Sequence, residues 1–342
     1  MNIGILYRKP DESGKDYPFD SEGRGEIKHV LRIKQALQAL GYNTHLVELD
    51  LDTYAYLRHA HFDLVFNLCD DGFRNDPLLE AHIPAMLDIL QIPYSGAGFL
   101  SLATCVNKAR TKEILAFNKI VTPESQIFEN SGQSLKPDMH FPLIVKPIHE
   151  DASIGMKKES VVSDLARLKH RIEVINREYN QAALVEKFIQ GREIYVGILG
   201  NAQNLTVLPL SEIIFDDELE QTAKICTYEA KWIENSEQSK STPVQCPARI
   251  EQSLEQELVR IAKRAYTLLQ CSDYGRVDFR IDHDNQPYVL EVNPNPDISE
   301  DAGLARMVRA CGMTYDDLIN RIVTSALEKS RSRRKREKVE SI

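Results

Sequence analysis

The sequence lacks the cysteine patterns that mark a zinc site or a disulfide framework. Its six cysteines are scattered, and no two of them stand in a C-x-x-C motif. Unpaired cysteines are typical of reducing compartments, so this pattern predicts a cytoplasmic protein. The first residues, 1–7, form too short an apolar run for a secretory signal and instead predict a buried strand.

Long hydrophobic runs, internal repeats and low-complexity linkers are also missing. The apolar runs, such as residues 63–68 and 141–145, have the length of single strands, so no membrane span is expected. The net charge of −9 argues against a general affinity for nucleic acid. With 342 residues, the chain is long enough to form two or three domains.

Two common nucleotide-binding motifs are absent. No G-x-x-x-x-G-K-[ST] occurs, which excludes a P-loop. The turn with Gly96 and Gly98 falls one residue short of a dinucleotide fingerprint, because Ser101 stands where the last glycine belongs. This turn also comes late in the chain, so a Rossmann cofactor is not expected.

Hydrophobic periodicity predicts alternating strands and helices in the first part of the chain. The expected elements are strands at residues 3–7, 45–49 and 62–68 and helices at residues 27–40 and 78–90. That order is typical of a parallel sheet with helices on its faces. Ligands bind at the carboxyl ends of such strands, so residues 67–72 are expected near a ligand.

The middle of the chain carries a lysine at the end of an apolar strand. Residues 141–145 predict the strand, Lys146 ends it, and a polar loop with Ser153 and Gly155 follows. The amides and hydroxyl of such a loop can close over a phosphate that the lysine neutralises. Without that context, the lysine would be only the polar exit of the strand.

A second unit of two strands is expected at residues 183–199. Its first strand, residues 183–189, carries toward its end an acid followed by a lysine and an aromatic residue, and its second strand starts at Glu193. A strand end of this kind can offer its backbone to an adenine and a carboxylate to a ribose. On these residues alone, an ordinary hairpin with an ion pair is the alternative.

Residues 215–247 form a long polar excursion after a strand expected at residues 205–214. Long irregular segments in compact domains are often functional lids, and this one holds the only tryptophan of the chain, Trp232. Further helices are expected at residues 251–269, 302–310 and 315–327. The basic stretch at residues 329–338 is expected to be a frayed, solvated end.

A hairpin is predicted near the C-terminal end of the chain. Charged and apolar side chains alternate along residues 274–281, residues 282–287 have turn chemistry, and residues 288–293 return as a second strand. Strict alternation along the return strand assigns Leu290 to the apolar face and Val289 to the opposite face.

Three oxygen donors of this hairpin would share its polar face: Asp278, Glu291 and Asn293. Hard oxygen ligands suit Mg²⁺, particularly Mg²⁺ that is shared with substrate phosphates. Spacing alone leaves a solvated hairpin face as the alternative. The metal is favoured by the next segment, in which Pro294 and Pro296 break the strand directly after Asn293.

Together, these motifs resemble the D-alanine–D-alanine ligase branch of the ATP-grasp superfamily, over residues 3–327. The resemblance implies an α/β (α+β) protein with a three-domain ATP-grasp fold and an N-terminal parallel sheet. The expected units are an N-terminal substrate domain (1–104), a central subdomain (105–190), a C-terminal subdomain with the metal site (191–330) and a basic tail (331–342).

The resemblance also implies an activity. It predicts an ATP-dependent ligase that joins a carboxylate to an amine through an acyl-phosphate, with ATP and Mg²⁺ (or Mn²⁺) as cofactors and amino acids or peptides as substrates. It implies no nucleic-acid or membrane partner and is compatible with a homodimer. Two alternatives stay open, namely an ATP-grasp kinase that phosphorylates a hydroxyl and an ATP-binding sensor without turnover.

Individual residues take roles from the same resemblance. Phosphates are expected at Lys108, Lys146, Ser153 and Lys231, with Trp232 beside the last. The adenine and the ribose are expected at Glu186, Lys187, Ile189 and Glu193. The implied metal ligands are Asp278, Glu291 and Asn293. The implied catalytic residues are Ser153, Lys231 and Arg276, the last of which steadies the oxyanion of the acyl-phosphate.

The sequence departs from that family at both substrate ends. The glutamate that binds the first D-alanine is matched only loosely, by Glu22 or Glu26. At the other end Ala302 replaces a serine that binds the second substrate, and three acids lie nearby in sequence: Asp297, Glu300 and Asp301. A carboxylate brought there would meet repulsion. We therefore expect a poor D-alanine–D-alanine ligase that uses an amine-bearing or cationic acceptor.

Overall fold

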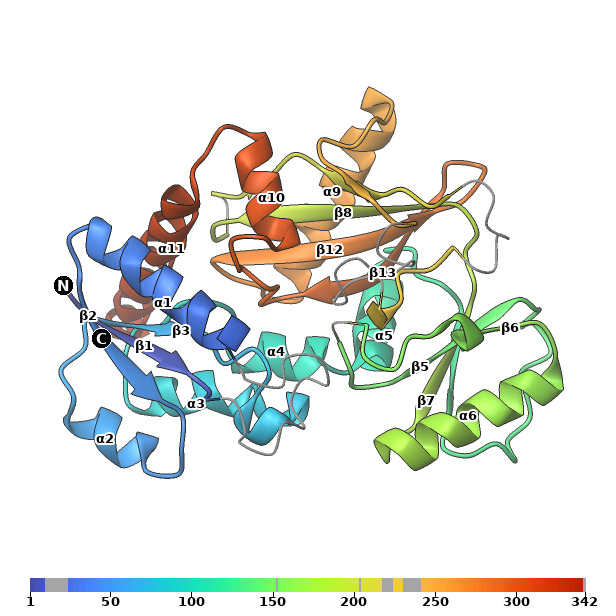
Figure 1. Ribbon diagram of the computed structural model, residues 1–342, viewed down its shortest axis with the longest axis horizontal. Coiled ribbons are helices and arrows are strands. Elements are labelled where there is room, and N and C mark those ends of the chain that lie inside the picture. Colours follow the sequence, from blue (N-terminus) through green and yellow to red (C-terminus); the bar gives the residue numbers. More distant parts are fainter. Residues whose placement is uncertain (10–23, 152, 203, 217–223, 230–240, 341–342) are drawn as a thin grey trace.

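The strands of the protein form three sheets in a computed structural model that describes residues 1–9, 24–151, 153–202, 204–216, 224–229 and 241–340. Figure 1 shows the N-terminal sheet and the central sheet at opposite ends of the molecule, with the largest sheet above the space between them. This mixed architecture with an N-terminal parallel sheet is the one that the sequence predicted. No helix among the described residues has the length and apolar character needed to cross a bilayer.

The N-terminal sheet is parallel throughout, as the alternation of strands and helices predicted. Its central strand β1 (Asn2–Tyr7) lies between β2 (Asn43–Glu48) and β3 (Leu64–Asn67). The helices of this region are α1 (Arg24–Ala39), α2 (Thr53–His59) and α3 (His82–Ile89). The last is shorter than the predicted helix, because Pro77–Leu79 form a separate 3₁₀ turn that Asp76 caps.

The central sheet is antiparallel and small. Its strand order is β4 (Ser125–Phe128), β7 (Ala183–Lys187), β5 (Leu143–Pro147) and β6 (Val161–Val162). Helix α6 (Leu165–Tyr179) covers one face and buries Leu168 and Ile172 against Val145 and Val185. Two helices, α4 (Phe99–Cys105) and α5 (Lys108–Phe117), lead into this sheet from the N-terminal part.

The largest sheet has six strands among the described residues, and its long strands are β8 (Arg192–Leu199), β12 (Tyr274–Ile281) and β13 (Pro287–Asn293), the last of which forms one edge. Its short strands are β9 (Thr206–Val207), β10 (Ser211–Ile213) and β11 (Val244–Gln245). One strand was expected at residues 205–214; Pro209 interrupts it, because proline has no N–H for the ladder. Helix α9 (Gln252–Leu268) packs its apolar stripe on one face of this sheet.

The predicted hairpin of β12 and β13 is present, but its register shifts in the middle. Asp278 pairs with Glu291, whereas Phe279 pairs with Val289, so Leu290 is the extra residue of a bulge. Val289 is therefore fully buried, and Leu290 lines a cleft on the other face. The assignment of Leu290 to the apolar face was wrong, because strict alternation holds only without a bulge.

The N-terminal sheet and the C-terminal helices share one hydrophobic core. A single cluster of fully buried residues runs from Ile5 on β1, through Ile33 on α1, to Leu304 on α10 (Gly303–Ala310) and Ile322 on α11 (Tyr315–Glu340). In Figure 1, α11 passes behind α1 and the N-terminal sheet. The two ends of the chain are thus held together by packing.

Helix α11 is continuous to Glu340, which corrects the expectation of a frayed end at residues 329–338. Lys329 Nζ lies 2.7 Å from the fully buried carboxylate of Asp273, which also accepts the backbone N–H of Gly96 at 2.9 Å. One turn further on, Arg333 forms an ion pair with Asp88. Basic residues four positions apart share one helix face, and here that face meets acids of the protein body.

Candidate active site

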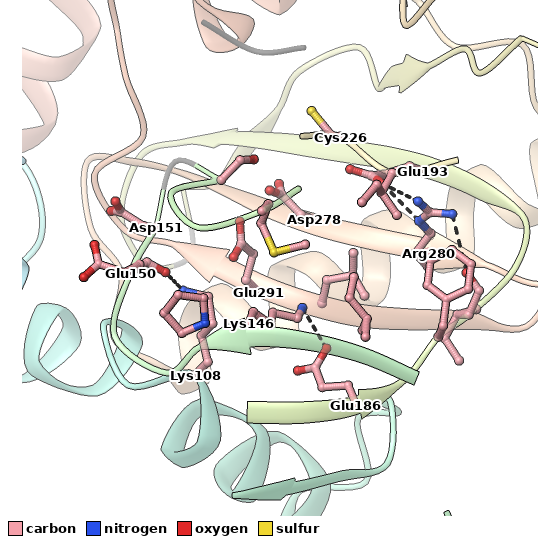
Figure 2. A pocket seen from close by; sticks show the side chains of 18 of the residues that line it. Lys108, Lys146, Glu150, Asp151, Glu186, Glu193, Cys226, Asp278, Arg280 and Glu291 are labelled. Atoms are coloured by element: carbon pink, nitrogen blue, oxygen red, sulfur yellow. Dashed lines mark hydrogen bonds and ion pairs between the residues drawn. The ribbon is translucent and has the colours of Figure 1, made fainter. Parts of the chain in front are cut away.

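A cleft lies between the central sheet and the largest sheet, with about 830 Å³ of empty space including its open mouth. Figure 2 shows side chains from both sheets pointing into it. The cleft brings together predicted site residues that are far apart in sequence: Lys108, Lys146, Ser153, Glu186, Lys187, Ile189, Glu193, Arg276, Asp278 and Glu291. Lys231 and Trp232 lie outside the residues that the structure describes, as do Glu22 and the side chain of Glu26.

One wall of the cleft is formed by the loop between β5 and β6. The ammonium group of Lys108, at the start of α5, donates a hydrogen bond to the backbone carbonyl of Glu150. The loop turns back on itself where Ile154 N–H donates to Asp151 O at 2.8 Å and Met156 N–H to Ser153 O at 2.9 Å. These turns place Ser153 beside the cleft that Lys108 also lines, and a hydroxyl with a lysine is a suitable set for a phosphate.

The backbone of this loop depends on a residue without a side chain. Gly155 has φ +76°, and a Cβ there would lie 2.7 Å from Cγ of Pro147. Ser153 also has a positive φ, of 65°. Arg171 on α6 donates to the carbonyl of Gly155 from behind, which holds the loop in this shape.

The lysine at the end of β5 belongs to a buried group of three charges. Glu186 on β7 is fully buried and lies 2.7 Å from Nζ of Lys146 and 2.9 Å from Nζ of Lys112 on α5. Burial alone would raise the pKa of Glu186, but the two ammonium groups lower it below its ordinary value. The carboxylate therefore stays ionised, and both of its oxygens are engaged by lysines rather than open to an adenine.

Burial lowers the pKa of Lys112, against the pull of Glu186. Its ammonium also donates to Thr122 Oγ1 at 2.8 Å. Sequence reasoning missed Lys112, although its position four residues after Lys108 places both on one side of α5.

The three predicted metal ligands lie together where the middle of β12 pairs with the end of β13. Asn293 Nδ2 donates to Asp278 Oδ2 at 3.1 Å and to Glu291 Oε1 at 3.4 Å. Arg276 holds Asp278 with two hydrogen bonds of 2.7 and 2.8 Å and lies over the ring of Tyr195. Burial alone would lower the pKa of Arg276, but Asp278 raises it above the ordinary arginine value.

This donor set fits Mg²⁺. Among the described residues, no group of three or more His, Cys, Asp and Glu side chains is arranged around a common point. Mg²⁺ needs no such group, because it is usually held by one or two carboxylates and completes its shell with phosphate and water oxygens. Asp278 and Glu291, directly opposite each other across the hairpin, supply those carboxylates.

At the far end of the cleft, an arginine that the sequence analysis had not singled out holds Glu193. Arg280 Nη2 lies 2.9 Å from Glu193 Oε2, and both side chains are buried. Its guanidinium also donates to the carbonyls of Ile189, Gly191 and Lys224. It also contacts the faces of two aromatic rings, those of Phe188 and Phe215. Arg280 thus fixes the strand end at which an adenine and a ribose were expected.

A group of acids lies at the carboxyl end of β3, where ligand contact was predicted. The pKa of Asp70 is raised well above its usual range, mainly by loss of hydration and secondly by the charge of Asp71. The residue itself is exposed. Burial, and next Asp151, likewise raise the pKa of Glu80. Because Asp151 also lines the main cleft, this acidic group adjoins the phosphate end.

Comparison with known proteins agrees with this geometry. The family model described as "D-ala D-ala ligase C-terminus" matches residues 113–324. The chain is 32% identical to a D-alanine–D-alanine ligase of Bordetella pertussis, over 88% of this chain and 90% of the relative. It is 33% identical to the uncharacterized protein y4sG of Sinorhizobium fredii, over 92% of this chain and 91% of that protein.

Solved structures give the same fold. A D-alanine–D-alanine ligase of Bacillus anthracis complexed with ATP superposes with a TM-score of 0.74 at 24% identity, covering 97% of this chain and 99% of that one. The VanG D-Ala:D-Ser ligase of Enterococcus faecalis superposes with a TM-score of 0.72 at 17% identity, covering 95% and 99%.

The fold and the charged cleft define an ATP-grasp enzyme, of the class that joins a carboxylate to an amine at the expense of ATP. Within that class, the family model and the curated relatives show that the chain belongs to the D-alanine–D-alanine ligase family.

Proposed function

We propose that the protein is an ATP- and Mg²⁺-dependent ligase that joins the carboxylate of an amino acid or peptide to an amine other than that of D-alanine. The observation that carries the proposal is the convergence of Lys146, Arg276 and Asp278 on one cleft. Phosphoryl transfer requires mainly positioning and charge neutralisation, and these side chains supply both.

The reaction has two steps. A carboxylate oxygen of the substrate attacks the γ-phosphorus of ATP, the bond to the leaving ADP breaks, and an acyl-phosphate forms. The acceptor amine then attacks the acyl carbon, the bond to phosphate breaks, and the nitrogen loses a proton. A cleft that excludes water protects the acyl-phosphate from hydrolysis between the steps.

Each part of the cleft has a proposed task. Lys108, Lys146 and the loop with Ser153 hold the phosphates, and Arg276 stabilises the charge on the acyl-phosphate. Asp278, Glu291 and Asn293 would hold Mg²⁺, which neutralises phosphate charge when bound. The segment with Glu186, Lys187 and Ile189 reads the adenine through its backbone and Glu193 binds the ribose, while Lys231 and Trp232 act from the segment 215–247.

The units inferred from the sequence fit this division of tasks. Residues 1–104 contribute the group of acids at the carboxyl end of β3, residues 105–190 the phosphate loop and its lysines, and residues 191–330 the metal ligands. Six free thiols support the cytoplasm as the place of action.

The proposal of an acceptor other than D-alanine rests on the acids near the expected site of the second substrate. Ala302 supplies no hydroxyl, and Asp297 adds its charge to those that raise the pKa of Asp70. Glu300 does not add to this negative charge, because Arg32 neutralises it with Nε 3.2 Å from Oε2 of Glu300. The remaining acids favour an acceptor that carries a positive group. One protein with this fold is named a D-Ala:D-Ser ligase, so the fold is not restricted to D-alanine as acceptor.

A screen of amino-acid pairs tests the proposal. ADP release is measured for each pair, and products are identified by mass spectrometry, with acceptors that bear a second ammonium group compared with D-alanine. We expect an amide product with a cationic acceptor and little D-alanyl-D-alanine.

Two results would contradict the proposal. D-alanyl-D-alanine formed at the rate of a dedicated ligase would refute the acceptor, and a phosphorylated hydroxyl without amide would favour a kinase. The variant Lys146→Ala serves as the control, because ADP release that survives it comes from another enzyme in the preparation.

A further inference from the structure

The cleft wall beside Lys146 holds three buried charged groups, two positive and one negative. Lys112, Glu186 and Lys146 form a line of positive, negative and positive groups, with Glu186 in the middle. Lys146 and Glu186 line the cleft, whereas Lys112, on α5, does not. The side chains of Lys112 and Glu186 keep only 4% and 1% of their surface exposed, so water screens them little.

The pair of Lys146 and Glu186 alone would be neutral. A phosphate arriving at Lys146 would then meet a carboxylate 2.7 Å behind the ammonium, and attraction and repulsion would nearly cancel. Lys112 supplies a second positive charge on the other side of the same carboxylate. The group as a whole then carries a net charge of +1 toward the cleft.

We propose that Lys112 is a positioning residue for the nucleotide: it neutralises Glu186 from behind, so that the charge of Lys146 remains available to the phosphates. Lys112 touches neither the substrate nor the reacting atoms in this arrangement and acts only through Glu186. The inference rests on the proposed ATP site and adds to it a residue that neither the sequence analysis nor the family comparison assigned.

Glu186 has a matching task. With one oxygen toward each ammonium, it fixes the position of Lys146 on β5 relative to helix α5, which also carries Lys108. A rigid lysine loses less side-chain entropy when it binds a phosphate than a free one. The triad therefore orients Lys146 as well as tuning the charge of the cleft.

The test compares nucleotides that differ only in phosphate. Binding of ATP and of adenosine to the full-length protein is measured in the presence of Mg²⁺, by competition with a fluorescent ADP analogue. Lys112→Met is expected to weaken ATP binding on the order of tenfold, as one unit charge does at several ångströms in a partly buried site. Adenosine binding should stay within about twofold, because adenosine carries no charge for the triad to meet.

Two further variants separate charge from packing. Lys112→Arg keeps the charge and should keep the ratio of ATP to adenosine affinity. The double variant Lys112→Met with Glu186→Gln removes one charge of each sign, which restores the net charge of +1, and should bind ATP more tightly than Lys112→Met; the recovery is partial because Glu186 also orients Lys146. Arg110→Met is the matched control, since it removes a positive charge from the exposed side of the same helix and should leave the ratio unchanged.

The outcomes are distinct. If Lys112→Met weakens ATP and adenosine equally, or the double variant does not recover ATP binding, Lys112 is only a structural residue and the inference is wrong. If the parent protein binds neither ATP nor adenosine, the proposed function itself fails. A KM for ATP that rises in Lys112→Met with little change in kcat would agree with a positioning role.

Discussion

Replacing Arg280 by methionine should both destabilise the protein and weaken nucleotide binding. Methionine fills a similar apolar volume but leaves Glu193 buried without its cation, at 8% side-chain exposure. Removing one partner of a buried ion pair costs about 3–5 kcal/mol. Three backbone carbonyls lose a donor as well, and two of these hydrogen bonds are buried, so we expect the loss to fall toward the upper end of this range.

The assay is urea denaturation of parent and variant followed by circular dichroism. We expect a loss of about 3–5 kcal/mol in the free energy of unfolding for Arg280→Met. The double variant Arg280→Met with Glu193→Gln should lose less, because the unpaired charge is gone. As a matched control, Arg260→Met breaks an exposed ion pair with Glu257 on α9 and should cost less than about 1 kcal/mol.

The reasoning would be refuted if Arg280→Met unfolded within 1 kcal/mol of the Arg260→Met control. It would also be refuted if the double variant were less stable than the single one, because Glu193 would then not be the group that needs the cation. ATP affinity measured on the folded variant should fall, since the carbonyl of Ile189 and the carboxylate of Glu193 lose their common anchor.

Three further predictions concern the same cleft. Asp278→Asn or Glu291→Gln should abolish ADP formation with an unchanged circular dichroism spectrum and should weaken binding of Mn²⁺ as seen by electron paramagnetic resonance; parent-level turnover would contradict the metal assignment. Because the pKa of Glu186 is lowered in the folded state, its contribution to stability is complete above the ordinary value of 4.5 and is lost as pH falls through the lower folded value. The difference in unfolding free energy between the parent and Glu186→Gln should therefore be constant above pH 4.5 and shrink as pH falls below it, and a difference that stays undiminished below pH 4.5 would exclude a lowered pKa. Amide exchange at Tyr228, which donates to Met156 O at 3.2 Å, should slow when an ATP analogue binds and draws in the phosphate loop, and equal exchange with and without the analogue would argue against closure.

Much of the architecture could be predicted because local patterns and global packing agree. The strands of the N-terminal sheet alternate with an amphipathic helix, and chain order alone then requires a parallel sheet. The alternation of residues 274–281 likewise predicted β12, and its polar positions do face the cleft. These features depend on side-chain periods that a sequence displays directly.

The bulge at Leu290 shows where periodicity is insufficient. A bulge depends on how β13 pairs with β12 and cannot be read from the hydrophobic pattern of either strand. The basic C-terminal stretch was misjudged for a related reason. Its composition suggested a solvated end, but Asp273 and Asp88, which hold Lys329 and Arg333, lie far away in the sequence.

Partners of charged groups were the least predictable part of the site. Glu186 fits an adenine-reading strand end in sequence, yet its carboxylate turns to Lys112 and Lys146, which come from two other elements. Arg280 likewise looked like one more charge of an alternating strand. Such pairings are set by tertiary distance, so a single sequence displays only the candidates.

The core shared by β1, α1, α10 and α11 has a consequence for engineering. A chain truncated after residue 104 would expose the apolar side of α1 that Leu304 and Ile322 cover in the intact protein. Residues 1–104 are therefore not an exchangeable module, although they are continuous in sequence. A chimera that imports this domain from another ligase would have to import the last helices as well, and the two ends of the gene must change as one unit.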